Sequence, residues 1–223
     1  MEEVLNTHNA ESLTERGKEW EILQEVEYRH LTPDDDLSRA AELLYKVDPY
    51  IFPDFFGDEE RAKMFGPALF NGEKNALFSF DRTLVAEQNG KLMRILCYRT
   101  SEVTSWDSEA VTERFRETGA KLPENFARAN ENYMKKITDG KLPEGSTEIE
   151  FIATAPEVRG KGVGSHLINQ LKESGDFDTL HLDVLGDNTN AIHVYEKHGF
   201  KTTYDFPSYP DGAITVHHME CKI

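Results

Sequence analysis

A glycine-rich turn between a strand-like segment and an amphipathic helix constrains the fold more than any other feature of the sequence. Residues 147–155 alternate as a strand does, and Pro156 ends them. The letters RGKGVG then open a helix that we expect over residues 165–174. The backbone N–H groups of such a turn and the positive end of the helix dipole converge on one place, and glycine allows close approach. The turn therefore predicts a phosphate-binding site.

The spacing of the glycines limits which phosphate ligand fits. The order required for a P-loop, with Gly-Lys-Ser/Thr after four intervening residues, is absent. A dinucleotide fingerprint has its third glycine elsewhere, counted from Gly160 or from Gly162. Asp183, nineteen residues after Gly164, imitates the ribose-binding acid of that fold. A nucleotide-binding oxidoreductase therefore stays open as an alternative.

A second motif lies about 25 residues after the turn. Asn188, Ala191 and Tyr195 share one stripe of a predicted helix that follows a strand over residues 180–185, and Gly199 ends this helix. The text N-x-x-A-x-x-x-Y-x-x-x-G-F, after RGKGVG, resembles the GNAT superfamily of acetyl-CoA-dependent N-acetyltransferases. The resemblance is strong over residues 149–206. Before and after that range it rests on the order of the elements alone.

The resemblance implies an α/β fold with three layers, in which helices flank a mixed, mostly antiparallel sheet of six to seven strands. We expect residues 1–25 to form an N-terminal extension and residues 26–223 to form one acetyltransferase domain. A helical insertion over about 101–145 would separate the third and fourth strands, with helices over 108–117 and 124–138.

Other segments carry local predictions. Strands are expected at 26–31, 76–80, 83–87 and 91–100, with a tight turn at Asn89-Gly90. A helix is expected from Leu37 to Tyr45. The stretch DPYIFPDFFGD contains two prolines and is expected to be irregular, with aromatic rings that pack on the core or wall a pocket.

The implied reaction is direct acyl transfer from a thioester to a primary amine in a ternary complex. The amine must lose a proton and the leaving thiolate must gain one. By resemblance, Tyr195 donates the proton to the thiolate. Glu148 lies eleven residues before Arg159, as the base does in the histone-acetylating branch, and Glu150 is predicted to share its face of the strand with Ile152 and Thr154. Carboxylates exposed at the start of a strand remain the alternative.

The coenzyme site follows from the same resemblance. Backbone groups on the strand bind the pantetheine arm, the turn binds the pyrophosphate, and the later helix lies beside the arm. The residues so implied are Ile152, Ala153, Thr154, Arg159, Gly160, Lys161, Gly162, Val163, Gly164, Ser165, Asn188, Ala191 and Tyr195. No metal ligand set is expected, since no pair of histidines or cysteines has the spacing of one.

The amino-acid composition limits the classes of partner that the protein can bind. Twenty-five basic residues against 41 acidic ones give a net charge of −16, which opposes binding to nucleic acids and anionic membranes. Cys97 and Cys221 are expected to be reduced thiols, and the acidic N-terminus lacks the pattern of a signal peptide. We therefore expect a cytoplasmic protein that acts on an amine whose identity the sequence leaves open. The oligomeric state stays open as well, with a homodimer as one alternative. A degenerate acyl-CoA-binding module of the same fold is a further alternative.

The proposed role of the glycine-rich turn can be tested by a substitution chosen from the sequence. Gly162→Val should abolish binding of coenzyme A while the protein stays folded, because the branched side chain blocks the close approach of the pyrophosphate. Isothermal titration with coenzyme A, together with circular dichroism, measures both properties. Unchanged affinity in a folded variant would contradict the assigned role of the turn.

Overall fold

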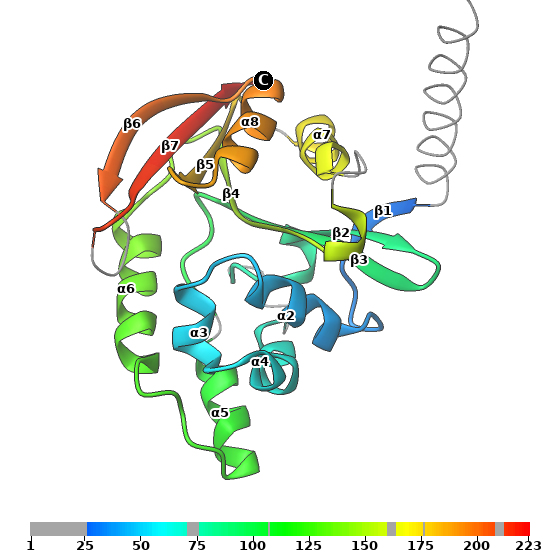
Figure 1. Ribbon diagram of the computed structural model, residues 1–223, viewed down its shortest axis with the longest axis vertical. Coiled ribbons are helices and arrows are strands. Elements are labelled where there is room, and N and C mark those ends of the chain that lie inside the picture. The colour runs from blue at the N-terminus through cyan, green and yellow to red at the C-terminus, as the bar shows by residue number, and fades with distance from the viewer. Residues whose placement is uncertain (1–25, 71–75, 107, 160–163, 176, 208–211) are drawn as a thin grey trace, which may run out of the picture.

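A seven-stranded sheet forms the centre of the protein in a computed structural model that describes residues 26–70, 76–106, 108–159, 164–175, 177–207 and 212–223 (Figure 1). The spatial order is β1-β2-β3-β4-β5-β7-β6. Only β4 and β5 pair in parallel among the described strands, and the other pairs are antiparallel. The predicted mixed sheet is confirmed. Its strands are β1 Val26–His30, β2 Thr83–Gln88, β3 Lys91–Thr100, β4 Ser146–Thr154, β5 Thr179–Leu185, β6 Lys201–Pro207 and β7 Thr215–Lys222.

Helices cover both faces of the sheet and complete the three predicted layers (Figure 1). One face packs against α2 Leu37–Tyr45, α3 Ile51–Phe56, α4 Glu59–Phe65, α5 Ser108–Thr118 and α6 Phe126–Asp139. The other face packs against α7 Gly164–Ser174 and α8 Thr189–Lys197. None of the helices in the described ranges has the length and apolarity needed to cross a membrane.

The hairpin between β2 and β3 turns at the predicted residues. Asn89 and Gly90 have φ angles of 53° and 75°, the left-handed conformation that this dipeptide tolerates in a two-residue turn. The two helices of the insertion also form where the sequence predicts them, as α5 and α6 between β3 and β4.

The proline-containing stretch differs from its prediction, because part of it is the helix α3. Pro53 is the third residue of α3, where the missing N–H has no intrahelical partner to lose. The Asp48 carboxylate accepts hydrogen bonds from the N–H groups of Tyr50 and Ile51, both at 2.7 Å, and so supports the start of the helix.

The strand expected over residues 76–80 is also wrong. Ala76 forms a single bridge to Ser105, and a 3₁₀ turn begins at Phe80. Leu77 and Phe78 are both fully buried, so consecutive side chains enter the core without the alternation of a strand. The apolar residues of segment 76–80 therefore indicate burial in the core and not a strand.

The last strand in the spatial order, β6, is a sheet edge. It pairs with β7 on one side, and every residue along it is exposed. Tyr204 and Phe206 are large side chains among them.

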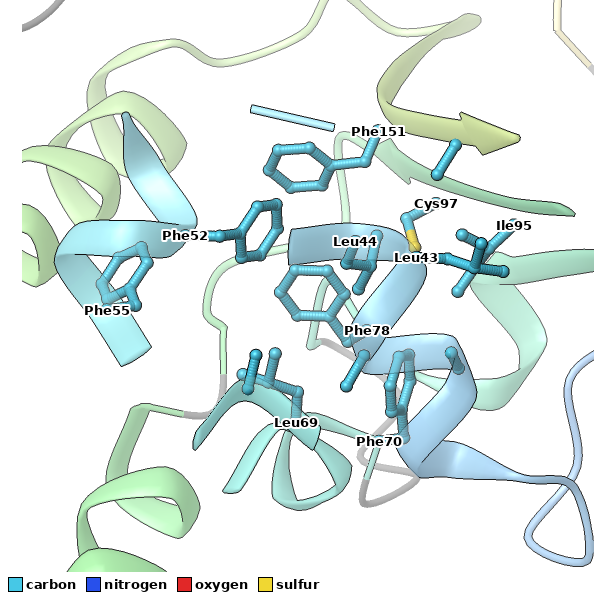
Figure 2. Close-up of a cluster of buried hydrophobic side chains, with 14 of the residues drawn as sticks. Leu43, Leu44, Phe52, Phe55, Leu69, Phe70, Phe78, Ile95, Cys97 and Phe151 are labelled. Atoms are coloured by element: carbon cyan, nitrogen blue, oxygen red, sulfur yellow. The ribbon is translucent and has the colours of Figure 1, made fainter. Parts of the chain in front are cut away.

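Aromatic rings fill the core between the sheet and α2–α6 (Figure 2). Phe55 is 1% exposed, and its ring centroid lies 4.3 Å from that of Trp106 and 5.8 Å from that of Phe126. Close packing of such rings adds stabilisation to the burial of their apolar surface.

Phe55→Ala should lower the free energy of unfolding by about 3–5 kcal/mol, because the substitution leaves a cavity among rings that cannot close around it. Met64→Ala, at a position 57% exposed, should change it by less than about 0.5 kcal/mol. Urea denaturation measures both. Equal effects would show that this aromatic cluster is not the main core.

Candidate functional site

The strands β4 and β5 separate in the middle of the sheet. Their parallel pairing runs from Ser146 and Thr179 to Ile149 and Leu182 and ends there. Beyond these residues β4 continues alongside β3, and β5 continues alongside β7. A wedge therefore opens between two strands that belong to one sheet.

A β-bulge lies where the wedge begins. Cys97 on β3 pairs with Phe151, while Tyr98 pairs with Ile149, so Glu150 is an extra residue on β4. The bulge places Glu150 and Phe151 on the same face of the sheet. Such an insertion shifts every later side chain of the strand to the face opposite to the one that simple alternation predicts.

The prediction that one face of the strand carries Glu148, Glu150, Ile152 and Thr154 is therefore wrong for Ile152 and Thr154. The two glutamates face α6, where both approach Lys136. Ile152 packs in the cluster of α7 and α8, and the Thr154 hydroxyl accepts a hydrogen bond from Arg94 Nε at 2.9 Å. Ala153 lies in the core on the side of α2.

The wedge holds a cleft with two adjoining cavities of about 130 and 190 Å³. Six residues border both: Asp48, Glu150, Phe151, Asp183, Val184 and Leu185. The smaller cavity is also lined by Val47, Ile149, Ile152, Leu182, Asn188 and Tyr195. The larger is also lined by Tyr50, Ile51, Tyr133, Lys136, Phe206 and Val216. Part of the proline-containing stretch thus walls a pocket, while its phenylalanines pack in the core.

A buried cluster of charges lies behind the cleft. Arg99 on β3 forms ion pairs with both Glu148 and Glu150, and all three side chains are at most 4% exposed. The ammonium group of Lys136 lies 3.0 Å from the Glu150 carboxylate and 3.6 Å from that of Glu148. Tyr133 donates a further hydrogen bond to Glu150 at 3.1 Å. Charges this deep in the protein persist only when they are paired and hydrogen-bonded.

The two glutamates differ in protonation because the nearby cations offset the effect of burial more fully at Glu150 than at Glu148. Burial, together with repulsion by Glu150, raises the pKa of Glu148 to about 7 against the effect of Lys136 and Arg99. Burial also acts to raise the pKa of Glu150, but attraction to Lys136 and Arg99 outweighs it and lowers that pKa. Glu150 is thus held as a carboxylate, while Glu148 exchanges a proton near neutral pH.

Sequence reasoning missed the role of Asp183, Arg99 and Lys136 in this cluster. Asp183 borders both cavities, and its carboxylate lies 2.7 Å from His218 Nδ1 and 3.5 Å from the Lys136 ammonium group. No local sequence motif predicts these contacts, because they arise from the pairing of strands and from the packing of α6. Arg99 was the available signal, because it is a charged residue near the end of a strand that is mostly buried.

Tyr195 lines the smaller cavity, on the α8 side of the wedge. Its ring centroid lies 5.9 Å from that of Phe200, and burial raises the pKa of the phenol to about 12. The phenol therefore keeps its proton at neutral pH. Asn188 caps this helix by accepting a hydrogen bond from the Ala191 N–H at 3.2 Å.

The remaining predicted coenzyme ligands follow β4. Arg159 Nε donates to the Thr154 carbonyl at 3.2 Å. Gly164 and Ser165 form the first two positions of α7. Four residues of the turn lie outside the described residues: Gly160, Lys161, Gly162 and Val163.

A model of the acetyltransferase (GNAT) family matches residues 42–200, which is most of the chain. The chain belongs to the GNAT family of acetyltransferases. It is also 34% identical over 70 residues to an uncharacterized protein of Mycobacterium leprae. That match covers 31% of this chain and 20% of the mycobacterial protein, so the chain spans about a fifth of the curated relative.

Solved structures show the same GNAT fold at low sequence identity. The crystal structure of an acetyltransferase superposes with a TM-score of 0.60 at 19% identity, covering 88% of this chain and 99% of that one. An N-acetyltransferase from Staphylococcus aureus Mu50 gives 0.60 at 18% identity, over 87% and 99%. The ribosomal-protein-S18-alanine N-acetyltransferase from Escherichia coli gives 0.51 at 18% identity, over 89% and 94%.

The raised pKa of Glu148 makes stability depend on pH. The folded protein binds a proton at Glu148 that the unfolded chain has released between about pH 4.5 and pH 7, so this residue's contribution to stability falls as the pH rises through that range. Glutamine does not titrate. The free energy of unfolding of Glu148→Gln, relative to the unmodified protein, should therefore rise by about 1–3 kcal/mol between about pH 5 and pH 7.5.

Urea denaturation at the two pH values measures this difference. Glu131→Gln, at an exposed position of α6, serves as the control and should leave the pH dependence unchanged. A constant difference between Glu148→Gln and the unmodified protein would contradict the raised pKa.

Proposed function

We propose that the protein transfers an acetyl group from acetyl-CoA to a primary amine. The observation that carries the proposal is the cleft between β4 and β5, which has a protonated phenol on one side and carboxylates on the other. Acetyl-CoA supplies the activated thioester. We take residues 26–223 to form the catalytic domain, with the helical insertion as one wall of the cleft.

The wedge fits the extended pantetheine arm of the coenzyme. Beyond Ile149, the edge of β4 that faces β5 has lost its β5 partner within the described strands, and backbone groups at such an edge pair readily with the amides of a ligand. Ile152, Ala153 and Thr154 lie on this part of β4. With Asn188, Ala191 and Tyr195 on the α8 side, and the segment from Arg159 to Ser165 at the start of α7, they are the proposed coenzyme ligands.

Tyr195 is the proposed general acid. A phenol whose pKa is about 12 is fully protonated at neutral pH, and it can donate that proton when a thiolate leaves. Its place in the smaller cavity, with Ile149 and Ile152 of β4, puts it where the wedge opens.

Glu148 is the proposed general base, acting through water as the family resemblance implies. A pKa of about 7 suits the removal of a proton at neutral pH. Glu150 borders the cleft as a permanent carboxylate and attracts the amine in its cationic form. Arg99 and Lys136 hold both glutamates in place.

The acceptor end of the cleft has the chemistry of a site for a small organic amine. Carboxylates of Asp48, Glu150 and Asp183 border it, together with the rings of Tyr50 and Tyr133. Aromatic faces attract cations as carboxylates do. The E. coli relative acetylates the alanine of a ribosomal protein according to its name. The partly buried cavity of this protein favours a small molecule over a protein terminus.

Thermal unfolding with acetyl-CoA, coenzyme A, NAD and ATP tests the coenzyme first. A ligand at about 100 times its Kd adds roughly 2.7 kcal/mol of stability, so the two coenzyme A forms alone should raise the Tm. A panel of primary amines with detection of released thiol then identifies the acceptor. Stabilisation without any turnover would indicate a degenerate acyl-CoA-binding module, and a shift with NAD alone would overturn the proposal.

Tyr195→Phe should lower kcat by about 10²- to 10⁴-fold while the affinity for coenzyme A changes little, because only the proton donor is lost. Tyr45→Phe, whose hydroxyl approaches the Gly57 carbonyl outside the cleft, is the matched control and should keep full activity. Steady-state kinetics with the identified amine measures both. Full activity of Tyr195→Phe would remove Tyr195 from the mechanism.

A further inference from the structure

Two histidines and a glutamate meet on the α6 face of the sheet, next to the cleft. His181 is on β5, and His218 and Glu220 are on β7. His181 Nδ1 lies 3.2 Å from His218 Nε2. One oxygen of Glu220 lies 3.8 Å from the first nitrogen and 3.9 Å from the second. Three atoms able to coordinate a metal therefore surround a common centre.

The size of this triangle matches the coordination distances of a transition metal. A point at its centre is about 2.1 Å from all three atoms, and zinc binds histidine nitrogen and carboxylate oxygen at about 2.0–2.2 Å. The histidine side chains are 9% and 10% exposed, while that of Glu220 is 31% exposed. The centre is thus buried on the histidine side and open to solvent on the glutamate side.

The outer nitrogen of each ring already has a partner. His218 Nδ1 is 2.7 Å from the Asp183 carboxylate, and His181 Nε2 is 3.2 Å from the Ser146 hydroxyl. When a carboxylate accepts a hydrogen bond from the N–H of one ring nitrogen, the other ring nitrogen carries a lone pair, which is the arrangement found behind metal-binding histidines. If both outer nitrogens donate, two lone pairs face each other, and a cation between them removes their repulsion.

The surroundings favour a cation on balance. Glu148 and Asp183 lie on the same face of the sheet, and their carboxylates add negative charge beside the two histidines. Lys136 faces the cluster from α6 but is paired with Glu150 and Asp183, and Lys222 on β7 donates to Thr179. From β6, Tyr204 stacks on His218 with 4.5 Å between ring centroids and shields one side.

We propose that His181, His218 and Glu220 form a binding site for a zinc-class divalent cation, with Asp183 and Ser146 as its outer hydrogen-bond partners. Two nitrogens and one oxygen favour zinc over magnesium or calcium, which prefer oxygen ligands alone. The open side of Glu220 leaves room for water as a fourth ligand.

Occupancy of the site would reach the cleft through His218. A metal on Nε2 keeps the proton on Nδ1 of His218, which then donates a hydrogen bond to Asp183, a residue that borders both cavities. The metal would also join β5 to β7 at the side of the wedge. Its expected effect is to fix the position of Asp183 in the wall of the acceptor end.

Metal binding can be measured without acetyl-CoA or an acceptor, so failure of this proposal is separate from failure of the proposed function. Full-length protein, freed of any affinity tag and treated with EDTA, is titrated with zinc chloride by calorimetry. We expect one ion per chain with a Kd of about 1 μM or tighter and a higher Tm. Cobalt(II) should give the visible absorption of a four-coordinate site.

Variants locate the ion. His218→Gln and Glu220→Gln should each weaken zinc binding by at least about 10-fold, and Asp183→Asn, outside the coordination sphere, by about 10–100-fold. His217→Gln is the matched control, because its ring projects from the opposite face of β7 and pairs with Asp205. It should bind zinc as the unmodified protein does.

Two results would overturn the proposal. The first is no saturable binding of zinc by the unmodified protein. The second is binding that survives in folded His218→Gln and Glu220→Gln, which would place the ion elsewhere and leave the two histidines as a hydrogen-bonded pair.

Discussion

The separation of β4 from β5 is the constraint on which the rest of the site depends. A parallel pair that stays together offers no backbone group to a ligand, whereas one that parts after four residue pairs opens a wedge within the sheet. The bulge at Glu150 fixes where the change occurs and turns two consecutive side chains toward α6. One inserted residue thus places Glu150 and Ile152 on opposite faces of the sheet.

The buried charges show how α6 belongs to the site and not only to the scaffold. Burying Glu148 and Glu150 would be strongly unfavourable without Arg99 from β3 and Lys136 from α6. The helical insertion therefore supplies a cation that the sheet lacks. Because these cations offset the burial of Glu150 more fully than that of Glu148, the cluster contains one permanent carboxylate and one that titrates near neutral pH.

The family and most elements could be predicted because their signals are local. The turn residues Asn89-Gly90, the cap Asn188 and the apolar period of α2 each act within a few positions. The bulge at Glu150 had no such signal, since it exists only in the register with β3. The same holds for the cluster of His181, His218 and Glu220, whose members have no ligand spacing along the chain and meet through the pairing of β5 with β7. The prolines were misleading in α3, because Pro53 lies in the first turn, where its missing N–H costs no hydrogen bond, and Asp48 supports the start of the helix.

The two ends of the cleft differ in how freely they can change during evolution. The proposed donor end is built from β4, β5 and α8 around the core that faces α7, where a change in Ile149 or Leu182 disturbs the packing of α7 as well. The proposed acceptor end includes Phe206 on the exposed edge strand β6 and Tyr50 just before α3. Substitutions there alter the shape of the larger cavity with little effect on the core. Under the proposed function, new acceptors can therefore be acquired at this end while the chemistry at the other end stays the same.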